Sequence, residues 1–81
     1  MQIRVLFFAS LAEQTQTRQC ELQVEKGVTL SQVKDILAKQ FPGAAAVFPL
    51  CLTALNQVYA AGDPLLQDGD ELAVFPPVSG G

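Results

Sequence analysis

The sequence is organised around one helical segment, TLSQVKDILAKQF, which spans residues 29–41. Thr29 and Gln32 have the spacing of a capping box, in which each side chain accepts a hydrogen bond from the other residue's backbone N–H. Apolar residues recur at helical spacing from there: Leu30, Val33, Ile36, Leu37 and Phe41. Pro42 ends the segment because proline disfavours the helical conformation at the residue before it. The segment predicts one amphipathic helix with a single face for a core.

The chain before this helix alternates between apolar and other residues, which is typical of strands. Residues 20–25 alternate cleanly, whereas residues 3–8 are largely apolar on both faces. The connection between these two strands is of modest length, so they are expected to pair as an antiparallel hairpin. Within the connection, residues 10–13 have the pattern of a capping box and predict at most a short helical turn. Residues 14–19 are expected to form a loop.

The chain after the helix contains further short elements separated by turn signals. They are an irregular or weakly helical stretch at 43–49 and strands at 51–56, 57–61 and 71–75. Leu65 and Leu66, which lie between two turn signals, are expected under the sheet. The fold class is therefore α+β, with a mixed sheet of about five strands and one main helix packed on one face. We expect residues 1–75 to form the domain and residues 76–81 to form a flexible C-terminal tail.

Composition excludes several kinds of active site. The chain has 81 residues, which is enough for one domain, and it contains no histidine or tryptophan. Its two cysteines, Cys20 and Cys51, are far apart and lie in apolar stretches, so both are expected to be core residues. Ser–His and Cys–His catalysis, histidine-based zinc sites and CxxC motifs are excluded. A conventional side-chain active site or metal site is not expected.

The charges point away from nucleic acid and membranes. Five scattered Lys and Arg residues and a net charge of −3 give no basic stripe, so no nucleic acid partner is expected. There is no leader pattern and no apolar run of about 20 residues, so we expect a cytoplasmic protein without a membrane partner. Four acidic residues crowd together near the C-terminal end: Asp63, Asp68, Asp70 and Glu71. They predict either a solvated turn or a negative patch that docks on a basic partner.

The most specific signal is the tail, in which Phe75 is followed by PPVSGG, residues 76–81. Two prolines prevent a central strand from continuing and hold the chain extended. A tail of small residues cannot bury itself, and it is either a projecting arm or a frayed terminus. A carboxylate behind two glycines can thread a narrow channel in another protein, because no Cβ lies within two residues of it. The chain has no GxxxxGK[ST] phosphate loop, so a partner with ATP would have to activate that carboxylate.

The order of strand pair, capped helix, further strands, Asp-Gly-Asp-Glu turn and Gly-Gly ending resembles the ubiquitin-like β-grasp family. Within it, the chain resembles the small, sulfur-carrier subunits of molybdopterin synthase. The segments that carry this resemblance are Val5–Ala9, Ala54–Gln57, Asp63–Leu65, Asp68–Glu71 and Phe75–Gly81. It covers essentially the whole chain, and the Phe-Pro-Pro-Val-Ser-Gly-Gly ending is its most specific part.

This resemblance implies a carrier that is not an enzyme on its own. A ubiquitin-activating-like adenylyltransferase would adenylate the Gly81 carboxylate, and a sulfur donor protein would supply the sulfur for a thiocarboxylate. The sulfur would pass to a cyclic pterin precursor on the large subunit, forming the molybdopterin dithiolene in molybdenum cofactor biosynthesis. Gly80 and Gly81 would occupy the large subunit's pocket, with Val78 and Ser79 at its entry. The resemblance also implies a heterotetramer, with no cofactor on this chain and ATP used by the activating partner.

Strand parity locates the partner surface. If Ile3, Val5, Leu72 and Val74 face the helix, the side chains that point outward are Leu6, Phe8, Ala73 and Phe75. Exposed apolar patches mark interfaces, so we expect these four residues to bind the partner together with Pro76, Pro77, Val78 and Ser79. The alternative is that the segment around Phe48 and Leu50 covers this face.

Two other functions remain open on the sequence alone. The first is a sulfur carrier for thiamine synthesis or tRNA thiolation, which would use the same activation chemistry. The second is a ubiquitin-like protein modifier that is joined through Gly81 to lysines of other proteins.

Overall fold

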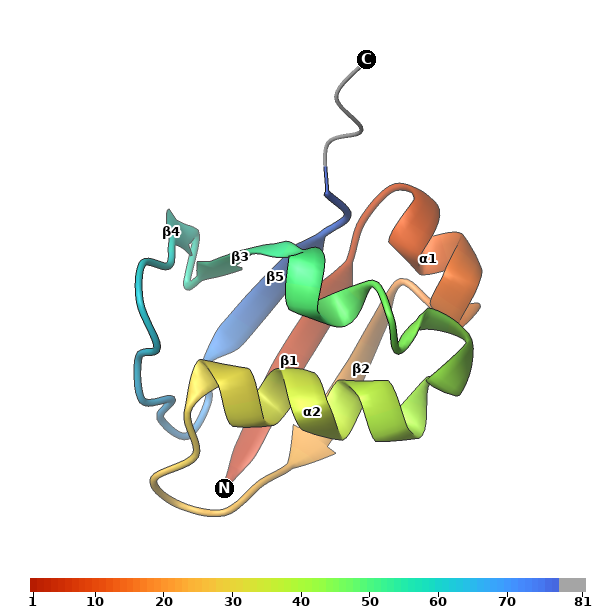
Figure 1. Cartoon of the computed structure of the whole chain (residues 1–81). Coiled ribbons are helices and arrows are strands. Elements are labelled where there is room, and N and C mark those ends of the chain that lie inside the picture. The colour runs from red at the N-terminus through yellow and green to blue at the C-terminus, as the bar shows by residue number, and fades with distance from the viewer. Residues whose placement is uncertain (78–81) are drawn as a thin grey trace.

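The computed structural model describes residues 1–77, which form one mixed five-stranded sheet with the helices on one side (Figure 1). The strands are β1 (Gln2–Phe7), β2 (Gln19–Gln23), β3 (Leu52–Leu55), β4 (Val58–Tyr59) and β5 (Glu71–Phe75). Their order across the sheet is β2-β1-β5-β3-β4. The central pair β1–β5 is parallel, and the other three pairs are antiparallel. The predicted fold class and the β1–β2 hairpin are confirmed.

The main helix, α2 (Leu30–Gln40), crosses one face of the sheet (Figure 1). Its predicted capping box is present: the Gln32 backbone N–H donates to the Thr29 hydroxyl at 3.3 Å, and the Thr29 N–H donates to Gln32 Oε1 at 2.9 Å. The chain continues into two short 3₁₀ helices, η1 (Pro42–Ala44) and η2 (Phe48–Leu50), which confirm the weakly helical stretch. Helix, sheet and 3₁₀ turns together enclose the core.

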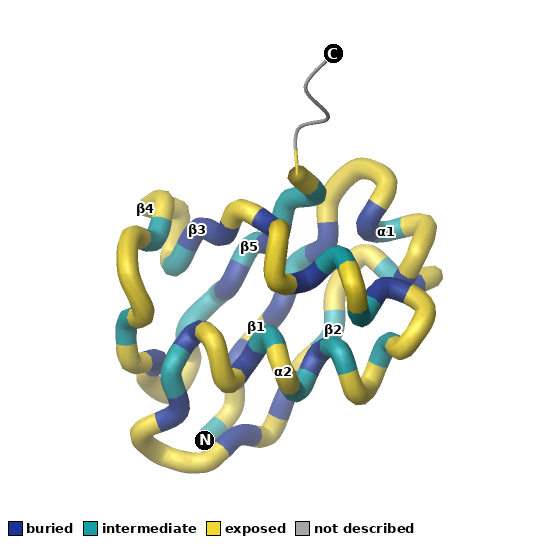
Figure 2. The backbone as a smooth tube through the Cα atoms, in the orientation of Figure 1, coloured by how far each residue is buried: buried dark blue, intermediate teal, exposed yellow. Residues whose placement is uncertain are grey.

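The core lies between α2 and the inner face of the sheet, where buried positions alternate along β1 and β5 (Figure 2). Phe48 is fully buried there, with its ring 6.3 Å from that of inward-facing Phe7. The alternative that the Phe48 segment covers the outer face is therefore wrong. The expectation for Leu65 is also wrong, because it is 63 % exposed while Leu66 is buried. Neighbours in an extended segment point in opposite directions, so only one of the two leucines can face the core.

The connection between β1 and β2 also differs from expectation. It contains a six-residue helix, α1 (Ser10–Thr15), where at most a short helical turn followed by a loop was expected. The helix begins after Ala9, and no side chain caps its N-terminus, so the predicted Ser10 capping box is wrong. Leu11 and Thr15 give α1 a buried face, and the Thr15 hydroxyl donates to the Leu11 carbonyl at 3.0 Å. Tertiary packing extends this helix beyond what its polar sequence indicates.

Candidate functional site

The outer face of the sheet, opposite α2, carries an apolar surface that no described element covers. The strand register aligns the residues of this surface in two rows. The first row runs from Leu6 on β1 through Ala73 on β5 and Ala54 on β3 to Tyr59 on β4. The second row pairs Phe75 on β5 with Leu52 on β3. Aligned residues on neighbouring strands share a face of the sheet. We call the surface formed by Leu6, Phe8, Leu52, Tyr59, Ala73 and Phe75 the outer patch.

Aromatic rings form the centre of the outer patch. The rings of Phe8 and Phe75 stack with centroids 4.8 Å apart, and the Tyr59 ring lies 6.2 Å from Phe75. Phe8 stays beside β5 because its N–H donates to the Val74 carbonyl at 3.2 Å. Phe8 is 41 % exposed, Leu52 52 % and Tyr59 72 %. The aromatic rings of the patch therefore pack against one another, yet much of its apolar area remains open to solvent.

The rest of the outer face is polar. Arg4 on β1 lies opposite Glu21 on β2 and Glu71 on β5, and the Arg4–Glu71 ion pair measures 4.0 Å. Gln2 and Gln23 form the next row. The outer face thus changes from polar at the start of β1 to apolar at its end. Partner binding through this face would involve the apolar end.

The structure brings together the four outward residues that parity predicts: Leu6, Phe8, Ala73 and Phe75. Sequence reasoning missed Leu52 and Tyr59, because only the register of β3 and β4 places them beside Phe75. The predicted tail begins next to the patch, where Pro76 is half-buried and Pro77 is exposed outside any strand. The predicted site residues Val78, Ser79, Gly80 and Gly81 lie outside the described residues.

The remaining candidates for a reactive site within residues 1–77 are acidic and sulfur-containing side chains. No group of three or more His, Cys, Asp or Glu side chains in this part of the chain could hold a metal ion. Burial raises the pKa of the Cys20 and Cys51 thiols, although Lys34 partly offsets the effect at Cys51. Both thiols are therefore protonated and poorly nucleophilic at neutral pH. None of the helices in the described part is long and apolar enough to span a membrane.

Comparison with known proteins identifies a family to which this chain is similar. The model of the ThiS family matches residues 5–81. A human protein named molybdopterin synthase sulfur carrier subunit is 40 % identical in sequence. The match covers 99 % of this chain and 94 % of the human protein's length. SAMP1 of Haloferax volcanii, a small archaeal modifier protein, superposes with a TM-score of 0.86 at 30 % identity over all of both chains.

A third similar protein was solved in an assembly. It belongs to a complex of subunits 1 and 2 of the molybdopterin-converting factor of Helicobacter pylori, with a TM-score of 0.72 and 26 % identity over all of both chains. The family match spans nearly the whole sequence, and the strand order and capped helix agree with the ubiquitin-like β-grasp fold of these structures. The chain belongs to the ThiS family.

Proposed function

We propose that this chain is the sulfur carrier subunit of a molybdopterin synthase and that the Gly81 carboxylate carries the sulfur. The observation that supports this most directly is the outer patch, an uncovered apolar surface beside the point where β5 leads into Pro76 and Pro77. The human relative is named as such a carrier, and the Helicobacter pylori relative was solved in complex with a second subunit. A docking surface next to the point where the C-terminal segment leaves the sheet fits the delivery of a terminal group into a partner.

The chemistry needs no catalytic side chain from this chain. A carboxylate is a poor electrophile at neutral pH, so an adenylyltransferase partner supplies ATP. A Gly81 carboxylate oxygen attacks the α-phosphorus, pyrophosphate leaves and an acyl-adenylate forms. A sulfur nucleophile at the oxidation level of sulfide, provided by a sulfur donor protein, then displaces AMP and leaves a thiocarboxylate. The thiocarboxylate is ionised at neutral pH and is a strong nucleophile toward the cyclic pterin precursor bound on the large subunit.

The described residues have a separate task, which is to dock the chain on the large subunit. Leu6, Phe8, Ala73 and Phe75 bind it, and Leu52 and Tyr59 extend the surface toward the edge of the sheet. Pro76 and Pro77 keep the chain extended as it leaves the domain, because proline fixes φ and has no N–H for a strand ladder. Val78 and Ser79 line the entry to the large subunit's pocket, and Gly80 and Gly81 occupy it.

Intact-mass spectrometry tests the chemistry. After incubation with the adenylyltransferase, ATP and a sulfur source, the chain should gain the mass difference between sulfur and oxygen. Tandem fragmentation must place that gain at Gly81, because oxidation of Met1 gives nearly the same shift. Deletion of Gly81 should eliminate the product while leaving the thermal unfolding of the domain unchanged. A sulfur-containing product that persists in this deletion would refute the assignment.

A substitution in the outer patch tests the docking. Phe75→Arg should abolish co-purification with the large subunit, because it places a charge at the centre of the apolar surface. Phe75 points away from the core, so the circular dichroism spectrum should keep its native shape. Normal complex formation by this variant would show that the interface lies elsewhere.

The similarity to SAMP1 favours a second candidate, a protein modifier joined through Gly81 to lysines of other proteins. Both functions begin with the same adenylate, so activation alone does not separate them. A modifier produces isopeptide-linked adducts with a Gly81–lysine bond in digests of cell extracts. A carrier produces the sulfur mass shift only on the free chain.

A further inference from the structure

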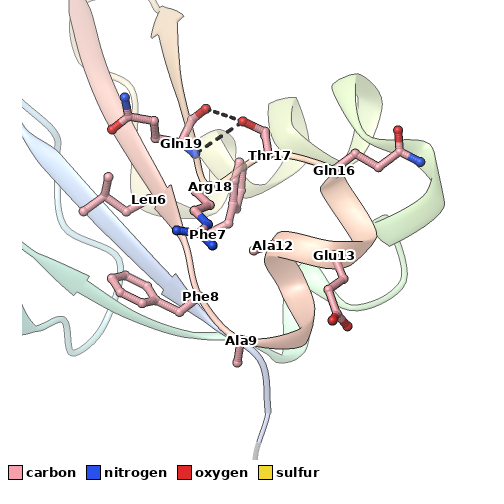
Figure 3. A pocket seen from close by; sticks show the side chains of 10 residues that line it. All are labelled: Leu6, Phe7, Phe8, Ala9, Ala12, Glu13, Gln16, Thr17, Arg18 and Gln19. Atoms are coloured by element: carbon pink, nitrogen blue, oxygen red, sulfur yellow. Dashed lines mark hydrogen bonds between the residues drawn. The ribbon is translucent and has the colours of Figure 1, made fainter.

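An open hollow adjoins the outer patch. It has a volume of about 730 Å³ and lies between the end of β1, helix α1 and the start of β2 (Figure 3). Leu6 and Phe8 belong to both surfaces, and Ala9 and Ala12 add further apolar wall. The hollow is therefore continuous with the surface proposed to bind the large subunit. A partner seated on the outer patch would reach into it.

The polar side of this hollow contains Arg18, which is exposed at the start of β2 (Figure 3). Among residues 1–77 the only ion pair joins Arg4 to Glu71, and no side chain in that part of the chain hydrogen-bonds the Arg18 guanidinium. Two other cations are engaged within the chain, since Arg4 is paired and Lys34 donates to the Cys51 carbonyl at 3.2 Å. The Arg18 guanidinium thus has no ion-pair partner within residues 1–77, and it lies beside an apolar wall.

We infer, on the basis of the proposed function, that Arg18 binds an Asp or Glu side chain of the large subunit within this hollow. A planar guanidinium matches a carboxylate with two parallel N–H···O bonds. The apolar walls strengthen such a pair once the partner excludes water. Glu13 also lines the hollow, and its negative charge repels a phosphate or a nucleic acid more strongly than a single carboxylate.

Binding of the purified large subunit to charge-reversal variants tests this inference. Arg18→Glu should raise Kd by about tenfold or more, because it sets two carboxylates against each other at a partly desolvated site. Lys26→Glu is the matched control: it makes the same change in net charge in the exposed turn after β2, outside the hollow and the patch, and should leave Kd nearly unchanged. The wild-type affinity should fall as the salt concentration rises, whereas that of Arg18→Glu should rise, because salt screens an attraction in the first and a repulsion in the second.

A zero-length carbodiimide cross-link identifies the partner group. Arg18→Lys keeps the positive charge and provides an amine, so it should give a cross-linked peptide that the wild type lacks. Mass spectrometry should map the new amide to an Asp or Glu side chain of the large subunit. An amide at the large subunit's C-terminus, or no new cross-link, would overturn the inference.

The outcomes separate this inference from the proposed function. If Phe75→Arg abolishes binding but Arg18→Glu binds as tightly as Lys26→Glu, the outer patch stands and the role of Arg18 is refuted. If the wild-type chain does not bind the large subunit at all, the proposed function and the role of Arg18 both fail.

Discussion

Truncation of Phe8 gives the most quantitative test of the outer patch. An aromatic side chain buries roughly 150–250 Å² in all, and Phe8 remains 41 % exposed in the free chain. The area left for a partner to cover is thus about 80 Å², which corresponds to about 2 kcal/mol at about 25 cal/mol per Å². Phe8→Ala should therefore weaken binding of the large subunit by about 30-fold.

Isothermal titration calorimetry with the purified large subunit measures this change. Leu65→Ala is the matched control, because Leu65 is also an exposed apolar residue, 63 % accessible, but pairs with Thr29 near the start of α2. Its substitution should leave the affinity unchanged. Phe8→Ala also removes the stacking on Phe75, which costs the free chain about 0.5–1.5 kcal/mol in unfolding free energy. A Phe8→Ala affinity within about threefold of wild type, less than 1 kcal/mol, would refute the placement of the interface.

Two further predictions concern stability. Hydrogen bonds from the Ser31 N–H and hydroxyl lower the pKa of Asp63 from its ordinary 3.8, so its stabilising effect is present above that pH and is lost as the pH falls through the lowered value. The difference in unfolding free energy between wild type and Asp63→Asn, measured by urea denaturation, should therefore shrink under acid conditions; a constant difference would contradict this. Ala9 has φ 53° and ψ −134°, a conformation that favours glycine. Ala9→Gly should stabilise the chain by about 1 kcal/mol, because relief of strain outweighs the entropic cost of glycine, and a lower Tm would contradict that account.

The capped helix and the first hairpin could be predicted because local sequence encodes them. Thr29 and Gln32 bond each other three residues apart, without help from the rest of the chain. Ser10 and Glu13 have the same spacing but make no capping box, because Ala9 takes the capping position with a positive φ of 53°. Whether a capping box forms therefore depends on the backbone conformation of the preceding residue, Ala9. A sequence pattern alone does not predict that conformation.

The outer patch was also predicted only in part, because some of its residues are placed by local alternation and others by contacts between distant strands. Alternation within β1 and β5 places Phe8 and Phe75 on the face away from the helix. Tyr59 joins them only because Asn56 and Gln57 both adopt positive φ, which turns β4 tightly back on β3. The pairing of β3 with β5 then sets how far along the sheet Leu52 lies. Turn geometry and register therefore define the edge of the patch, and neither follows from alternation.

The acidic residues near the C-terminal end have a role within the fold. Asp68 accepts a hydrogen bond from the Gln2 N–H at 2.8 Å, and Asp70 accepts bonds from the Asn56 side chain at 2.9 Å and the Gln67 N–H at 2.7 Å. These bonds tie the loop before β5 to β1 and to the β3–β4 turn. The sequence suggested either a solvated turn or a docking patch, and these internal bonds give the carboxylates a structural use.

Distance also separates this acidic turn from the outer patch. The turn precedes β5, while Phe75 is the last residue of that five-residue strand. At about 3.3 Å per residue the two ends of β5 lie about 13 Å apart, which exceeds the screening length of about 8 Å at physiological ionic strength. The charges of the turn therefore contribute little to contacts made at the Phe75 end of the patch. We therefore expect specificity at that end to come from apolar shape and from Arg18. Charge changes at Asp68 should affect folding, whereas a charge change at Arg18 should affect binding.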